Sequence, residues 1–160
     1  MTNSTKIDDL EKIIDYEFNN QKILKKAQIR RAFLNENPAE NNECMDPLAT
    51  IGDAILDAVV VSRLYENGKC KKGELTECKN LQVKRERMRA FAKNHELYKF
   101  IQWGVGERKQ QIDINSEKAL DTVTEALIGA IYLDAQEKGL NGILEGRRIL
   151  DRMNFFEFQV

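Results

Sequence analysis

Apolar residues recur along most of this chain at the three- and four-residue spacing of amphipathic helices, and no stretch shows the alternation of a strand. The spacing predicts helices over about residues 7–16, 21–34, 46–67, 75–91 and 140–158, another beginning after Ser116, and a helical turn or two over 95–103. Turn-forming residues at 35–44 and from Gly104 to about Asn115 predict loops. We therefore expect an all-α protein in which residues 1–160 form one domain.

Between Pro47 and Ser62, the segment Asp46–Tyr65 is apolar on nearly every side, which is typical of a helix that runs through the middle of a domain. Two acids interrupt it, Asp53 and Asp57, and their four-residue spacing puts both on one face. A carboxylate among apolar residues costs free energy unless a cation or hydrogen-bond donors compensate it. This helix is therefore a candidate location for a functional site.

A later predicted helix also carries two acids, Asp121 and Glu125. If the two helices pack together, their acids need a divalent cation such as Mg²⁺, which prefers carboxylate oxygen and carries waters that can attack phosphate. Structural roles remain open for three acids: Asp46 could cap its helix, Asp57 could face solvent or pair with a base, and Asp121 could be an early-turn acid favoured by the helix dipole. Asp53 and Glu125, flanked by small and apolar residues, are harder to explain in this way.

Charge is distributed unevenly along the chain. The formal net charge of −1 on its own argues against a strong nucleic-acid binder. Residues 32–62, however, hold six acids and no Lys or Arg, whereas residues 69–93 hold nine bases and three acids. An acidic centre beside a basic helix suits a cation-dependent enzyme that acts on a polyanion. A solvated helix face with ion pairs between neighbouring turns would give the same pattern.

The remaining composition indicates an ordinary intracellular protein. No apolar run approaches the roughly 20 residues that cross a bilayer, and the first residues lack the apolar core of a signal peptide, so we expect a cytoplasmic protein. Cys44, Cys70 and Cys78 form no CxxC or Cys/His pattern, and we expect them to be reduced thiols.

Four blocks of the sequence resemble the ribonuclease III family, in the family's own order. DPLATIGDAIL at 46–56 is similar to the family signature, which reads Glu, any residue, Leu, Glu, Phe, Leu, Gly, Asp, Ala and then apolar residues. Later helices and a loop of the family are matched by GELTECKNLQV (73–83), LYKFI with GVGE (97–101 and 104–107) and EKALDTVTEALIGAIYLDA (117–135). The resemblance implies the helical fold of the family's endonuclease domain.

Carried over residue by residue, the resemblance implies that Asp53 and Glu125 bind the catalytic metal ion. Lys118 matches a lysine that faces the scissile phosphate in Dicer-like members, and Asp46 matches the leading glutamate of the signature. Asp121 lies one residue from the position of a further family ligand, a rotation of about 100° on a helix. The resemblance leaves Asp46 and Asp121 as candidates to hold waters or a second ion.

Several positions depart from the family pattern. Ala49 stands where the second signature glutamate binds metal, and Thr122 stands where an aspartate does. Thr50 replaces an aromatic residue that many members insert into their dimer partner, and QIRR at 28–31 replaces the usual Leu-Thr-His motif. The short Mini-III branch is similar in having Ala and Thr at the two ligand positions, so the departures imply a weakened one-metal or substrate-assisted site.

We therefore expect a homodimeric endoribonuclease that cleaves double-stranded or structured RNA with Mg²⁺, or alternatively Mn²⁺, as cofactor. Without a second RNA-binding domain its affinity should be weak and salt-sensitive. The bases expected to follow the RNA backbone are Lys79, Lys84, Arg85, Arg87 and Arg89. The missing ligands keep open a second class of protein, a catalytically inactive RNA-binding or scaffold domain on the same fold.

Overall fold

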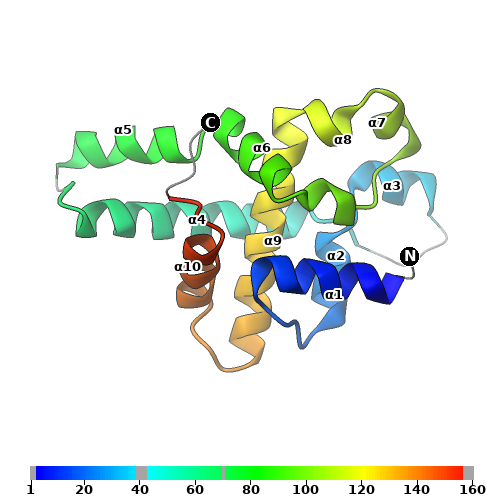
Figure 1. The fold of residues 1–160 in the computed structure, drawn as a ribbon, viewed down its shortest axis with the longest axis horizontal. Coiled ribbons are helices and arrows are strands. Elements are labelled where there is room, and N and C mark those ends of the chain that lie inside the picture. The colour runs from blue at the N-terminus through cyan, green and yellow to red at the C-terminus, as the bar shows by residue number, and fades with distance from the viewer. Residues whose placement is uncertain (1–2, 39–42, 70, 157–160) are drawn as a thin grey trace.

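Two 21-residue helices, α4 (Asp46–Glu66) and α9 (Glu117–Glu137), cross near the centre of the fold (Figure 1). The computed structural model describes residues 3–38, 43–69 and 71–156, and within these ranges the regular structure is entirely helical. The other helices are α1 (Asn3–Ile14), α2 (Gln21–Ala27), α3 (Arg31–Glu36), α5 (Lys72–Gln82), α6 (Arg85–Asn94), the 3₁₀ helix η1 (Leu97–Phe100), α7 (Val105–Lys109), α8 (Ile112–Asn115) and α10 (Gly142–Arg152). The predicted all-α fold is confirmed.

Two glycines allow α4 and α9 to touch through their backbones. A Cβ atom added to Gly52 would lie 1.7 Å from the backbone oxygen of Glu125, and one added to Gly129 would lie 2.0 Å from the backbone oxygen of Leu48. No side chain fits at either position unless the helices separate. The crossing therefore depends on glycine in both helices.

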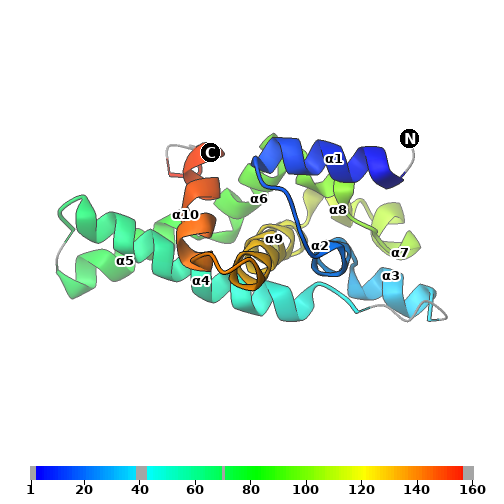
Figure 2. The same cartoon turned by 90° about the horizontal axis from the view of Figure 1, so that it is seen from below.

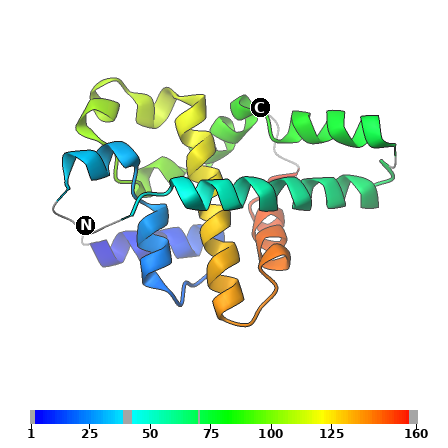
Figure 3. The same cartoon turned by 180° about the vertical axis from the view of Figure 1, so that it is seen from behind.

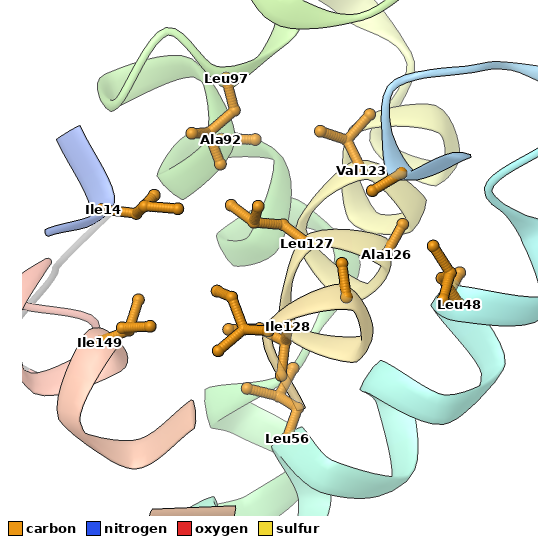
Figure 4. Packing of buried hydrophobic residues seen from close by; sticks show 14 of the residues in the cluster. Ile14, Leu48, Leu56, Ala92, Leu97, Val123, Ala126, Leu127, Ile128 and Ile149 are labelled. Atoms are coloured by element: carbon orange, nitrogen blue, oxygen red, sulfur yellow. The ribbon is translucent and has the colours of Figure 1, made fainter. Parts of the chain in front are cut away.

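The helix at the middle of the core is α9 rather than α4. Figure 2 shows α9 nearly end-on with other helices around it, and α9 has 12 buried residues against seven in α4. Its side chains Val123, Leu127 and Ile128 pack with residues of α4, α6 and α10 (Figure 4). The prediction that the segment from Asp46 runs through the middle of the domain was therefore wrong, because that helix leaves one face in solvent.

The far half of α4 forms an arm with α5. The two helices run antiparallel and extend away from the remaining helices (Figure 3), and α5 buries none of its residues. An ion pair helps to hold them together, with Lys79 Nζ 2.8 Å from Asp57 Oδ2. Of the two structural roles that the sequence left open for Asp57, the structure thus shows pairing with a base. Asp57 does not line the cleft described below.

Several predicted helices are divided in the structure. Residues 21–34 form α2 and α3, because the helix is interrupted at residues 28–30. There the N–H of Arg30 donates to the backbone oxygen of Gln102, and the N–H of Gln102 donates to the backbone oxygen of Gln28. Residues 75–91 belong to α5 and α6, which are separated at Val83 and Lys84. The predicted loop after Gly104 contains the short helices α7 and α8.

The start of α9 agrees with the sequence prediction, and the end of α10 does not. Ser116 caps α9 as predicted, accepting a hydrogen bond from the backbone N–H of Ala119. α10 ends at Arg152, earlier than predicted, and Phe158 lies outside the described residues.

Cys44 and Cys78 are free thiols, as expected, while Cys70 also lies outside the described residues. In the described part of the chain, no helix is both long and apolar enough to span a bilayer.

Candidate active site

A cleft of about 630 Å³ opens beside the crossing of α4 and α9. Its walls come from the N-terminal halves of these two helices and from residues around α3, α7 and α8. The residues that line it are Arg30, Arg31, Asp46, Ala49, Thr50, Asp53, Glu107, Ile112, Ser116, Lys118, Ala119, Thr122 and Glu125. Acids and bases therefore face the same cavity.

The two acids predicted to be the metal ligands, Asp53 and Glu125, both line this cleft. Asp53 is exposed and directly follows Gly52, while Glu125 is half-buried and has its own backbone oxygen against Gly52. The glycine crossing thus fixes how the two carboxylate-bearing turns face each other. The structure brings together the pair that the sequence singled out.

Asp121 belongs to the same acidic group but not to the cleft lining. Its side chain is only 14% exposed, shares a hydrogen bond with Glu125, and lies 3.6 Å from Nε of Arg85, measured at Oδ2. It faces α6 rather than the cavity. The expectation that Asp121 holds waters or a second ion stays a prediction.

Burial and mutual repulsion favour the protonated forms of these acids. Burial raises the pKa of Glu125 to about 7, with further contributions from the charges of Asp121 and Asp53 and from the hydrogen bond to Asp121. Burial raises the pKa of Asp121 to about 6, against the opposing effect of Arg85. Two neighbouring carboxyl groups with raised pKa values form a site that a cation would stabilise.

Asp46 does not cap α4. The N-cap residue is Met45, Asp46 is the first residue of the helix, and its Oδ2 lies 2.7 Å from Nε of Arg31. The capping role considered from the sequence was therefore wrong. Asp46 remains at the edge of the cleft with an arginine as its partner.

Sequence reasoning missed three charged residues of the cleft, Arg30, Arg31 and Glu107. Arg30 forms a shielded ion pair with Glu107, with Nη2 2.8 Å from Oε1 and side chains 17% and 11% exposed, and its guanidinium also lies over the ring of Trp103. The only signal for the arginines was the QIRR departure at 28–31. The ion pair of Glu107 could not be predicted from residue spacing, because its partner Arg30 is far away in the sequence.

The five bases predicted to follow RNA have different environments. Lys84 and Arg85 are exposed, Lys79 pairs with Asp57, and Arg89 is half-buried and donates to the backbone oxygen of Asn115. Arg87 is only 5% exposed, and its guanidinium donates to the backbone oxygens of Gln82 and Phe155. We therefore remove Arg87 from the predicted RNA-binding set, because its charge is used inside the fold.

The chemistry of the cleft fits one hard divalent cation. Within the described ranges no three His, Cys, Asp or Glu side chains form a ready-made ligand cluster. Mg²⁺, however, is usually held by one or two carboxylates and several waters. Asp53 and Glu125 supply that number of carboxylates in an open cavity large enough for waters.

Residues 46–136 match the family model described as the Ribonuclease III domain. This match covers more than half of the chain, including α4, α9 and the cleft residues that they carry. The chain belongs to the ribonuclease III family.

Relatives and solved structures agree with this assignment. The chain is similar to Ribonuclease 3 of Lactobacillus acidophilus, with 35% identity over 82% of this chain and 58% of the relative, and to Ribonuclease 3 of Azotobacter vinelandii, with 35% identity over 89% and 58%. It thus spans a little over half the length of these relatives. A solved nuclease domain of ribonuclease III from Campylobacter jejuni superposes with a TM-score of 0.81 at 26% identity, covering 96% of this chain and 99% of that one.

Both departures from the ribonuclease III ligand pattern, Ala49 and Thr122, face the cleft. Ala49 is 6% exposed, and the Thr122 hydroxyl donates to the backbone oxygen of Lys118, one turn earlier in α9. Neither residue offers a carboxylate to a cation. The cleft thus has fewer acidic groups than the family pattern would give it.

The raised pKa values predict an unusual pH dependence of stability in the absence of metal ions. The unfolded-state pKa values lie near 4, so the neutral acids stabilise the fold below that pH, and the stabilisation is lost as pH rises through about 6 to 7. In Glu125→Gln the melting temperature should fall less between about pH 5 and pH 8 than in the wild type. Circular dichroism melts in EDTA measure this difference.

Comparison of the wild type with Glu125→Gln isolates the contribution of Glu125 to the pH dependence. Burial lowers the pKa of His95, which removes stability as pH falls, but His95 is present in both proteins. Equal pH slopes would show that Glu125 does not carry the effect.

Proposed function

We propose that this chain is a metal-dependent endoribonuclease that cleaves double-stranded or structured RNA. The observation that carries the proposal is that Asp53 and Glu125, which match metal ligands of the family, line one cleft together with Lys118. The family supports an endoribonuclease. The cleft supports hydrolysis at phosphate, since carboxylates for a cation and a base for a phosphate oxygen face the same space.

Three residues of the cleft have distinct roles in this proposal. Asp53 and Glu125 hold one Mg²⁺ or Mn²⁺ ion, which when bound acts as a Lewis acid and lowers the pKa of the attacking water. Glu125 must lose its proton to act as a ligand, so its raised pKa makes the site weaker at acidic pH. Lys118, exposed at the start of α9, donates to a phosphate oxygen as negative charge develops there.

The proposal predicts metal-dependent cleavage of a structured RNA. A purified duplex RNA incubated with the chain should be cut in Mg²⁺ or Mn²⁺ and left intact in EDTA. Asp53→Asn and Glu125→Gln should each lower the rate by at least about 100-fold, because each removes a charge that holds the ion. Gel analysis of the cleavage products measures the rates.

Glu66→Gln provides the control for this experiment. Glu66 lies in the last turn of α4, paired with Arg147 and away from the cleft, so the rate of this variant should match that of the wild type. RNA that binds but is not cut in Mg²⁺ or Mn²⁺ would instead support the inactive RNA-binding or scaffold domain. Cleavage that persists in both acid variants would reject the proposed site.

The exposed bases at the start of α6 are proposed to contact the RNA backbone. Lys84 is half-exposed and its ammonium lies 3.1 Å from Glu86, a surface ion pair that a phosphate can replace at little cost. Arg85 follows it and Arg89 lies one turn further along. Such contacts supply affinity for A-form RNA without reading its sequence.

Lys84→Gln should weaken RNA binding about two- to fivefold at low salt and reduce the slope of log affinity against log salt by about one. Fluorescence anisotropy in Ca²⁺ or EDTA measures binding apart from cleavage. Lys99→Gln is a matched control, because Lys99 forms a similar exposed pair with Glu96 in η1. An equal effect of the two variants would remove the start of α6 from the RNA-binding surface.

We also propose that two copies associate through the exposed face of α4. This face presents Thr50, Ala54 and Ala58, small side chains that allow close approach of another helix. The Campylobacter jejuni neighbour, whose nuclease domain has a region involved in dimer formation, supports this proposal.

Light scattering at micromolar concentration should give about twice the 18.5 kDa mass of the chain. Ala54→Glu should give a monomer, because it places a charge in the interface without disturbing the core. A monomeric wild type would refute the dimer, and a dimeric Ala54→Glu variant would refute this face as the interface.

A further inference from the structure

Two of the four acids proposed from the sequence as metal ligands form ion pairs with arginines. Asp46 is held by Arg31, with 2.7 Å between Nε and Oδ2, and Asp121 is held by Arg85, with 3.6 Å between the corresponding atoms. Neither arginine belongs to the buried part of the fold, since their side chains are 62% and 65% exposed. Among the described residues, the acids of the cleft that form no ion pair are Asp53 and Glu125.

The position of Arg85 has a specific effect on Asp121. Arg85 is the first residue of α6, and it reaches Asp121 from the side of α9 on which α6 packs. A charged partner on that side favours the rotamer in which Asp121 faces α6. The same carboxylate is already hydrogen-bonded to Glu125, so it is close enough to matter for any ion held there.

We propose that Arg31 and Arg85 are positioning residues that pair with Asp46 and Asp121, keep these carboxylates from coordinating an ion, and so limit the cleft to one divalent ion at Asp53 and Glu125. The inference rests on the proposed function, because it concerns the same cleft. It adds that the loss of acids at Ala49 and Thr122 is accompanied by arginines that neutralise the neighbouring acids. The ion stoichiometry of the site is thus set by side chains that do not touch the ion.

The strength of the two ion pairs limits how far the arginines can lower metal affinity. Exposed ion pairs are weak, so each arginine can reduce metal affinity only modestly. A divalent ion carries twice the charge of a guanidinium and binds more strongly when more carboxylates are available to it. Removing an arginine should therefore release a carboxylate to the ion rather than unfold the site.

Mn²⁺ binding tests the inference without RNA. Electron paramagnetic resonance at about pH 8, where carboxylate ligands are deprotonated, counts the free and bound ions. The wild type should bind one Mn²⁺, Arg85→Gln and Arg31→Gln should each bind it about two- to fivefold more tightly, and the double variant should bind a second ion.

Arg152→Gln is the matched control. Arg152 pairs with Asp15 at 3.7 Å between Nε and Oδ2 with its side chain 66% exposed, nearly the geometry of Arg85, but it lies at the end of α10. It makes the same change in net charge and should leave Mn²⁺ affinity unchanged. Circular dichroism confirms that each variant is folded.

A double-mutant cycle separates the withheld carboxylate from a general field effect. The gain from Arg85→Gln should disappear in an Asp121→Asn background, since no carboxylate remains to be released. A gain of the same size in that background would overturn the inference, as would two ions in the wild type. Equal affinities in Arg31→Gln, Arg85→Gln and Arg152→Gln, or no binding by any variant, would overturn it as well.

The outcomes for metal binding and RNA cleavage are independent. One tightly held Mn²⁺ with the predicted arginine effects, but no RNA cleavage, would reject the proposed function and keep the inference. Cleavage that depends on Asp53 and Glu125, without any arginine effect on Mn²⁺ binding, would do the reverse.

Discussion

The rest of the structure depends on the backbone contact between α4 and α9 at Gly52 and Gly129. A Cβ atom at either position would overlap backbone of the other helix, so the helices can approach this closely only because both residues lack one. The same contact governs the cleft, because Asp53 follows Gly52 and the carbonyl packed against Gly52 belongs to Glu125. The same backbone contact therefore sets both the packing of the two helices and the relative position of the turns that carry the two carboxylates. A change that opened the crossing would cost stability and would also separate the acids.

The sequence predicted the helices that bury an apolar face and failed where tertiary contacts decide. α4 and α9 have long runs of apolar residues, and the sequence located both ends of α4 to within a residue or so and the start of α9. The break between α2 and α3 was missed because residues 28–30 pair with Gln102, a contact distant in sequence that no local propensity encodes. The greater burial of α9 was also invisible, because apolar content alone does not say which of two crossing helices has neighbours on all sides.

In the site, residues that share a helical face were predictable, and ion pairs between distant segments were not. Asp53 and Glu125 were singled out because small and apolar residues flank them in the sequence and because they match ligands of the family, although Asp53 is exposed in the structure. Arg31 and Arg85 gained their partners only through the fold. Arg87 is the instructive failure: it lies next to Met88 and four residues before Phe91, both buried, and this periodicity already indicated the inner side of α6. Counting positive charge without its helical position gave it an RNA-binding role that its burial contradicts.

The arm formed by α4 and α5 gives the molecule two mechanically different parts. The cleft is built on the densest contact of the fold, whereas α5 buries no residue and rests on α4 through partly exposed side chains and the Lys79–Asp57 pair. Elements with so little burial open at free energies far below that of global unfolding. Fraying of α5 would therefore release Lys79 and shift the bases at its end while α4, α9 and the acids between them stay in place. Under the proposed function, the contacts of these bases with RNA can therefore be lost and regained without any change in the geometry of the cleft.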